Sequence, residues 1–232
     1  ASSCGDAAAE ASALAGGGAP GYGDAAGEAA ALAERYPGDV GVLVSLLLNL
    51  VVLRPGEAIF MPAGNPHAYL RGMGVEVMAS SDNVLRGGLT PKHVDVPELL
   101  QVLRYAELPD PRMPAVPAQP EAATDTGQPR AATDTGRPPA GQADMAAEGA
   151  VWWPVPVADF RLARALLTGG TVRLPQPGEA GPRIVLCVAG EVALHAAGDR
   201  LTLRAGEAVY VPPADGPVDA SGRGELFQAT TG

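Results

Sequence analysis

The sequence predicts a mainly β fold with a short helical segment at the N-terminal end. Short apolar runs bounded by Gly or Pro recur between residues 49 and 85 and again between 150 and 232. That spacing is typical of antiparallel sandwiches and barrels. The two stretches also share a diverged internal repeat, whereas a helix-forming composition is confined to residues 25–48 and to a short run near residue 100. We therefore expect two related sets of strands.

The bulk composition excludes several classes of protein. The 232 residues carry a net charge of -10, whereas a general nucleic-acid binder normally shows a basic stripe. No apolar run approaches the roughly 18–20 residues that a membrane span needs, and the start lacks the pattern of a signal peptide. Cys4 and Cys187 share no metal-type spacing. We expect a cytoplasmic protein with reduced thiols and neither nucleic acid nor membrane as a partner.

Composition divides the chain into four segments. Residues 1–48 combine a flexible start with helical sequence, and residues 49–108 hold strands followed by a short helix near 96–104. Residues 109–149 are rich in Pro, Ala, Thr, Gly and Gln and repeat the motif Ala-Thr-Asp-Thr-Gly, so they are expected to form a low-complexity linker. Residues 150–232 return to short strands.

The most informative stretch lies between residues 49 and 98. Two apolar runs, 50–53 and 58–61, flank a Pro-Gly-Glu turn and predict a β-hairpin with a loop longer than two residues. His67 follows in a loop rich in Gly and Pro, and a third apolar run covers residues 75–77.

The internal repeat relates this stretch to the second set of strands. Leu-Arg-Pro-Gly-Glu-Ala-Ile-Phe-Met-Pro at 53–62 matches Leu-Arg-Ala-Gly-Glu-Ala-Val-Tyr-Val-Pro at 203–212, an offset of 150 (203 minus 53). Glu57 recurs as Glu207 and is therefore assigned to the fold. Where the first copy has His67, the second has Pro217, so the second copy is expected to be a structural partner.

Three ordered blocks carry a family resemblance: Gly64-Asn-Pro-His-Ala-Tyr-Leu, Glu76-Val-Met-Ala-Ser-Ser-Asp-Asn-Val-Leu-Arg and Gly88-Leu-Thr-Pro-Lys. They resemble the C-terminal signature of type I phosphomannose isomerases, which belong to the cupin superfamily of jelly-roll barrels. The resemblance is strong over residues 28–108 and weak over 150–232. It implies a double cupin-like fold, with a remnant of a helical insert domain in residues 1–48.

The resemblance also implies a reaction, the reversible conversion of mannose 6-phosphate and fructose 6-phosphate through an enediol, and a zinc ion. His67 matches a ligand of that zinc. The family completes the site with a Gln-x-His pair and a Glu from an N-terminal half, but this sequence contains no Gln-x-His. His93 and His195 are expected to be surface or structural residues. The chain therefore looks like a C-terminal portion whose partner is the N-terminal half, and alone it should bind zinc poorly.

Two cations would act on a phosphorylated hexose substrate. Arg86 matches the catalytic-site arginine, where a guanidinium can stabilise enediolate charge or hold a phosphate. The alternative is a surface arginine paired with Asp82. Lys92 would be a second cation near the sugar phosphate, and the alternative is a solvated loop lysine.

Three further side chains are candidates around these cations. Glu76, between Val75 and Val77, would bind sugar hydroxyls or transfer a proton, and its alternative is a buried salt bridge. Asp82 would orient Arg86 or Lys92, and Tyr69 would line the pocket. The catalytic set is thus Arg86, Lys92 and Glu76, the substrate-binding set is Tyr69, Asp82, Arg86 and Lys92, and the general base is left unassigned.

Two other functions remain open at this point. A double cupin with a partial site can be a non-catalytic sugar-binding or regulatory module, which the absence of an N-terminal half would favour. A cupin dioxygenase would need two or three His near His67 with a further Glu, which the sequence lacks.

Overall fold

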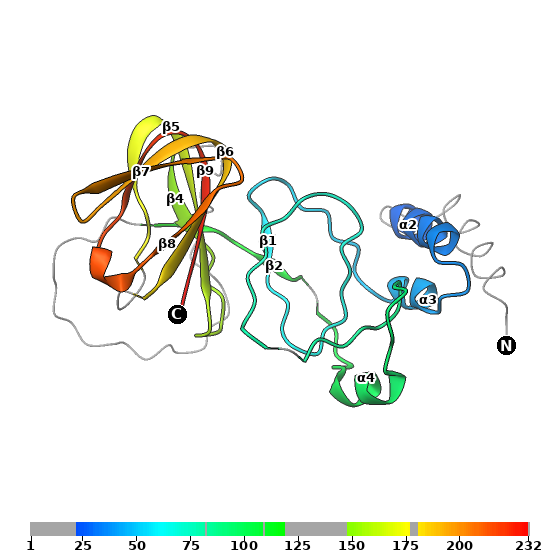
Figure 1. Cartoon of the computed structure of the whole chain (residues 1–232). Helices are drawn as coiled ribbons and strands as arrows, with labels where there is room; N and C mark the ends of the chain where they lie inside the picture. Colours follow the sequence, from blue (N-terminus) through cyan, green and yellow to red (C-terminus); the bar gives the residue numbers. More distant parts are fainter. Residues whose placement is uncertain (1–21, 82, 109, 119–147, 177–180, 232) are drawn as a thin grey trace. The chain divides into compact units, whose positions relative to one another are not determined.

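The computed structural model describes residues 22–81, 83–108, 110–118, 148–176 and 181–231 (Figure 1). The chain forms two compact units. One comprises Ala1–Val52, Met61–Gly72 and Ser81–Pro109, and the other comprises Leu53–Phe60, Met73–Ser80 and Asp110–Gly232. The first unit holds the described α-helices, and the second holds the described strands.

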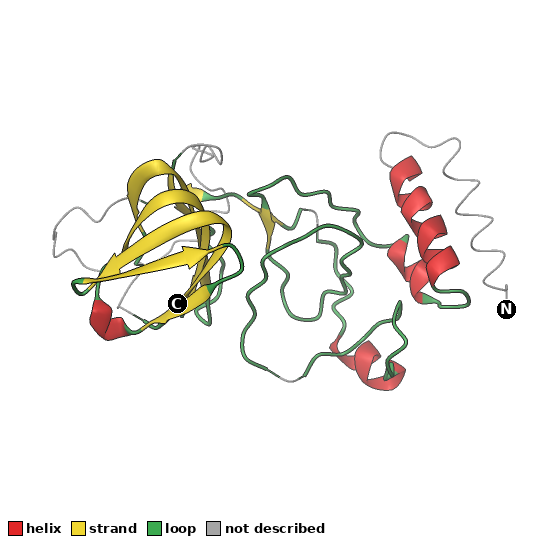
Figure 2. Ribbon diagram, turned by 45° about the horizontal axis from the view of Figure 1, so that its top comes forward, coloured by secondary structure: helices red, strands yellow, loops and turns green. Residues whose placement is uncertain are grey.

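A seven-stranded antiparallel sheet dominates the second unit, which confirms the prediction of a mainly β fold (Figure 2). Its strands run in the order β3-β4-β5-β9-β6-β7, and β8 also pairs with β6. They are β3 (Val116–Pro117), β4 (Gly149–Trp152), β5 (Arg161–Arg173), β6 (Arg183–Ala196), β7 (Asp199–Arg204), β8 (Ala208–Val211) and β9 (Asp219–Thr230), with the 3₁₀ turn η1 (Pro213–Asp215) between the last two.

Alternation along the paired strands β6 and β9 builds the core of this sheet. Val185 and Cys187 of β6 and Leu226 of β9 are completely buried and lie on one face of the curved sheet. Burying a side chain of this size contributes about 1.5–3 kcal/mol. Burial of the Cys187 thiol also raises its pKa, so this cysteine is a free and unreactive core residue.

The internal repeat has the same turn in both copies. In the first copy the Glu57 N–H donates to the Arg54 carbonyl at 3.0 Å, and its carboxylate accepts from the Arg54 N–H at 2.8 Å. In the second copy Glu207 and Arg204 make the same two bonds, at 2.9 and 2.7 Å. Each glutamate thus closes its own turn, which explains its recurrence without a catalytic role.

The predicted hairpin between residues 50–53 and 58–61 is wrong. Strand β1 (Ala58–Ile59) pairs instead with β2 (Arg112–Met113), and neither 50–53 nor the third run at 75–77 forms a strand. The second copy gives the reason, because β7 and β8 flank the equivalent turn and both pair with β6 rather than with each other. The turn therefore connects two strands that pair with different parts of the same third strand, β6.

Parts of the segment expected to be a linker, 109–149, are strands. It contains β2 and β3, and β4 begins at its last residue. Pro117 is tolerated because β3 is the edge of the sheet, where a missing N–H breaks no ladder bond. The two Ala-Thr-Asp-Thr-Gly motifs lie outside the described residues.

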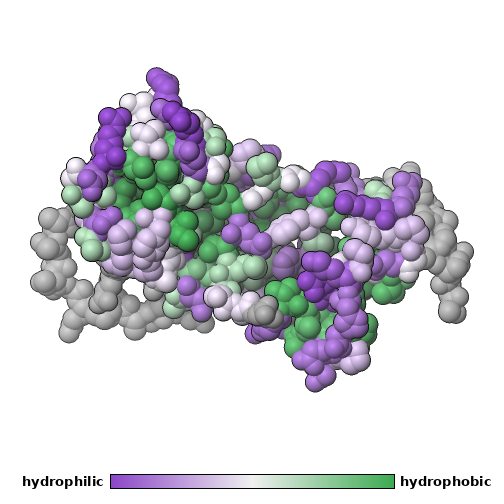
Figure 3. All heavy atoms as spheres, in the orientation of Figure 1, coloured by the Kyte–Doolittle hydropathy of each residue, from purple (hydrophilic) through white to green (hydrophobic). Residues whose placement is uncertain are grey.

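Among the described residues, the first unit contains the helices α2 (Tyr22–Arg35), α3 (Gly41–Ser45) and α4 (Val96–Val102). Asp95 caps α4 through a 3.1 Å bond from the Glu98 N–H, and Pro97 lies in the first turn, where its missing N–H costs nothing. Leu100 of α4 is 55% exposed, and hydrophobic residues gather on the visible surface over α4 (Figure 3). No described helix is long and apolar enough to cross a membrane.

The Asp39 carboxylate joins two distant parts of the first unit. Its Oδ1 accepts from the Gly41 N–H and its Oδ2 accepts from the Leu89 N–H, both at 2.7 Å. The chains approach so closely that a Cβ placed on Gly88 would lie 2.8 Å from Asp39 Oδ1 and 3.1 Å from the Cα of Gly41. The start of α3 therefore holds the segment that follows Arg86.

We expect Asp39→Asn to loosen this junction. An amide keeps one acceptor oxygen and turns an NH₂ group toward the other donor, which costs about 1–3 kcal/mol. Hydrogen exchange at the Gly41 and Leu89 amides should accelerate accordingly. The exposed Asp159→Asn is the matched control, with an expected change of less than about 0.5 kcal/mol. Equal exchange rates in both variants would contradict the role given to Asp39.

Candidate functional site

His67 lies in an exposed loop after β1, with its ring oriented by the backbone. Its Nδ1 is 3.1 Å from the Asn65 carbonyl oxygen. Because a carbonyl oxygen only accepts, Nδ1 must carry the proton of this bond. In the neutral ring Nε2 then keeps its lone pair, which is the arrangement found in histidines that bind metals. Tyr69 packs edge-on against the imidazole, with ring centroids 6.0 Å apart.

The end of α4 fixes the loop that carries His67. The Gly64 carbonyl accepts from the Arg104 N–H at 2.9 Å, and a Cβ on Gly64 would lie only 2.7 Å from the Val102 carbonyl oxygen. Gly64 also has a φ of +84°, which favours glycine. The loop is therefore fixed to the end of α4 at Gly64, three residues before His67.

Arg86 and Lys92 are both exposed and belong to the same unit as His67. Within the part of the chain that the structure describes, neither side chain makes a hydrogen bond or ion pair. The Asp39–Leu89 bond holds the backbone between them, and Leu99 of α4 lies next to Gly87, whose added Cβ would be 3.7 Å from Leu99 Cδ2. Thus α4 supports both the His67 loop and the Arg86 segment.

The other predicted residues are divided between the two units and the part of the chain outside the described residues. Tyr69 is exposed beside His67, whereas Glu76 is exposed and belongs to the second unit. Asp82 lies outside the described residues, so its predicted pairing with Arg86 or Lys92 stays a prediction. His93, which was expected to be a surface or structural residue, is exposed.

The described part of the chain contains no group of three His, Cys, Asp or Glu side chains that could hold a metal ion. His67 fits one position of a zinc site, because imidazole nitrogen is a regular zinc ligand and its Nε2 is unblocked. A tetrahedral site needs further donors from outside this set.

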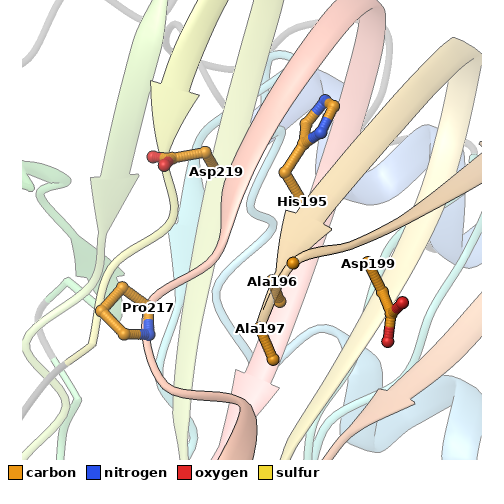
Figure 4. Close-up of a pocket in the computed structure, with 7 residues that line it drawn as sticks. His195, Ala196, Ala197, Asp199, Pro217 and Asp219 are labelled. Carbon is orange, nitrogen blue, oxygen red and sulfur yellow. The ribbon is translucent and has the colours of Figure 1, made fainter.

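Sequence reasoning did not single out a hollow of about 290 Å³ in the second unit, near the turn between β6 and β7 (Figure 4). His195, Pro217 and Asp219 line it, and His195 Nε2 is 3.0 Å from Ser221 Oγ. Arg173 hydrogen-bonds the Asp219 carboxylate and lowers its pKa. The sequence signal for this hollow was the period-two alternation of β9, which places Asp219 and Ser221 on the same face of the strand. The hollow contains none of the predicted site residues, and Pro217 stands where the first copy has His67.

Comparison with known proteins gives one consistent family. No family model matches the chain. It is 36% identical over 195 residues to the mannose-6-phosphate isomerase of Salmonella typhimurium, a match that covers 84% of this chain and 42% of that protein. The Escherichia coli mannose-6-phosphate isomerase is 35% identical over the same length and coverage. The Homo sapiens protein of that name is 55% identical over 74 residues, which are 32% of this chain and 18% of that protein.

Solved structures agree with the sequence relatives. An arginine-to-alanine variant of Salmonella typhimurium phosphomannose isomerase matches with a TM-score of 0.72 and 32% identity, over 98% of this chain and 50% of that one. The apo form of the same enzyme gives a TM-score of 0.70 over 97% and 49%. The chain is a homologue of the mannose-6-phosphate isomerases, and it spans about two fifths of the length of the curated relatives that it matches.

Proposed function

We propose that the chain forms part of a cytoplasmic, zinc-dependent isomerase that interconverts mannose 6-phosphate and fructose 6-phosphate. The observation that carries the proposal is the orientation of His67 within a chain homologous to enzymes of that name. Its Nδ1–H donates to the Asn65 carbonyl, which leaves Nε2 for a metal. The relatives give no support to the sugar-binding alternative.

The proposed reaction moves a proton between C1 and C2 of the sugar through a cis-enediol. It requires a base, polarisation of the carbonyl and hydroxyl oxygens, and positive charge for the substrate anion. A bound zinc ion would supply the polarisation as a Lewis acid. Arg86 would stabilise the developing enediolate charge, and Lys92 would attract the phosphate. Tyr69 would contact the sugar beside His67.

The second copy supports a proposal for the source of the remaining zinc ligands. Arg183, the first residue of β6, donates its Nη2 to the carbonyl of Gly216, which directly precedes Pro217. Since Pro217 is the counterpart of His67, a strand equivalent to β6 would begin beside His67. We infer that the partner of this chain, the N-terminal half of the enzyme, contributes that strand with the further ligands, and that Glu76 acts on the sugar only in the completed site.

We expect His67→Ala to remove zinc and activity together. The variant would be assayed after assembly with the portion of the Salmonella typhimurium enzyme that this chain does not match. Because second-shell changes alone cost about 10–100-fold, loss of a ligand should lower zinc affinity and isomerase activity at least a hundredfold. His195→Ala, in the second copy, should retain both. Full zinc content in the His67 variant would refute the ligand assignment.

Arg86→Ala should act on the rate rather than on the metal. Loss of a charge that stabilises the transition state typically lowers kcat about 10²–10³-fold. Zinc content should be unchanged, and Arg86→Lys should recover only part of the rate because an ammonium lacks the planar fork. The exposed Arg200→Ala on β7 is the control. A normal kcat with a raised KM would instead assign Arg86 to substrate binding alone.

A further inference from the structure

One end of the core in the second unit carries a buried positive charge. Arg183 of β6 pairs with Thr230 of β9 on one side and with Val211 of β8 on the other. It lies on the same face of β6 as Val185, a core residue two positions further along the strand. The side chain is therefore directed inward, and the residue is only 2% exposed. Since arginines are almost never buried to this extent unless they are paired, Arg183 needs a partner of opposite charge.

The described part of the chain does not supply that partner. A guanidinium has five N–H donors, and one of them, on Nη2 of Arg183, binds the Gly216 carbonyl. Nε and Nη1 are buried and have no hydrogen-bond partner among the described residues. Burial lowers the pKa of this guanidinium, and the charge of Asp215 opposes that effect only in part. A buried charge without its counter-charge is strongly destabilising, so an additional anion is required here.

Gln228 of β9 adds a free acceptor beside this guanidinium. It lies diagonally across from Arg183 on the same inward face, within reach of a long side chain, and it is also 2% exposed. Its Nε2 donates to the Pro175 carbonyl at 2.6 Å, which fixes the orientation of the amide because a carbonyl only accepts. In the region that the structure describes, the buried Oε1 of Gln228 then has no donor.

Arg161 of β5 places a second positive charge in the same row of side chains. It pairs with Thr230 from the side opposite to Arg183. Its guanidinium lies over the Trp152 ring, 5.5 Å from the ring centroid, and its Nε is buried without a partner among the described side chains and backbone. Two cations therefore flank Thr230, whose Oγ1 already donates to the Pro182 carbonyl at 2.9 Å. This charge favours an anionic ligand.

We propose that Arg183, Gln228 and Arg161 form a binding site for inorganic phosphate in the second unit. The phosphate oxygens would accept charge-assisted hydrogen bonds from the free N–H groups of Arg183. The protonated oxygen of hydrogen phosphate would donate to Gln228 Oε1. Sulfate has similar oxygens but carries no proton at neutral pH, so the site should prefer phosphate. Because the free atoms are buried, the site suits the small inorganic ion rather than a sugar phosphate.

The test follows thermal unfolding of the full chain in increasing concentrations of inorganic phosphate, with sulfate and chloride compared at the same ionic strength. Phosphate should raise the Tm in a saturable manner, as a ligand of the folded state does, and sulfate should raise it less. Arg183→Met removes the charge and keeps an apolar side chain. It should abolish the saturable response, and without phosphate it should be at least as stable as the parent chain because no unpaired charge remains buried.

A second variant tests the acceptor and serves if Arg183→Met does not fold. Gln228→Met introduces the residue that the first copy has at position 78 (228 minus 150). It should weaken the phosphate Kd about tenfold and remove the preference over sulfate, because the proton of the phosphate loses its acceptor. Arg86→Ala and the exposed Arg200→Met are the controls, and both should keep the phosphate response.

These measurements are independent of turnover, so their outcome is separate from that of the proposed isomerase activity. A parent chain without a saturable phosphate response would overturn the inference. It would also be overturned by a response that Arg183→Met and Gln228→Met both retain. A response that disappears in Arg86→Ala instead would assign the phosphate to the candidate site around His67. Equal responses to phosphate and sulfate would contradict the role given to Gln228.

Discussion

The pairing of β6 with its neighbours is the constraint on which the fold depends. In the second unit β6 pairs with β7, β8 and β9, and its inward side chains, including Val185, meet Leu226 of β9 in the core. The same turn and related strand sequences occur in the first copy, yet without a counterpart of β6 among the described residues they form only the two-residue β1. Strand propensity alone does not make a sheet, because each strand needs hydrogen-bonding neighbours on the correct side.

The candidate site is nevertheless held in place by bonds of its own. Asp39 fixes the backbone after Arg86, and the end of α4 fixes Gly64 before His67. These contacts are local to the first unit, so the orientation of the imidazole is prepared before any further ligand arrives. That arrangement suits a site assembled from more than one part of a polypeptide, because one ligand is already positioned when the others bind.

Sequence reasoning reached the elements that depend on local chemistry. The short helix near residue 100 and the Pro-Gly-Glu turn at Glu57 both follow from residue type and spacing. The resemblance supplied His67 and Arg86, which periodicity alone would leave as loop residues. What failed was strand pairing: the partner of β1 comes from Arg112–Met113, over fifty residues away, within a segment whose composition indicated a linker. Long-range pairing is set by the whole sheet and leaves no local signature.

The most direct test of the account is the position of the metal in the assembled enzyme. Crystals of this chain bound to the unmatched portion of the Salmonella typhimurium enzyme would be grown with zinc, and diffraction collected at the zinc edge. The account predicts an anomalous peak about 2.0–2.1 Å from His67 Nε2, with Nδ1 still bonded to the Asn65 carbonyl. A fully occupied zinc site that does not include His67 would contradict it.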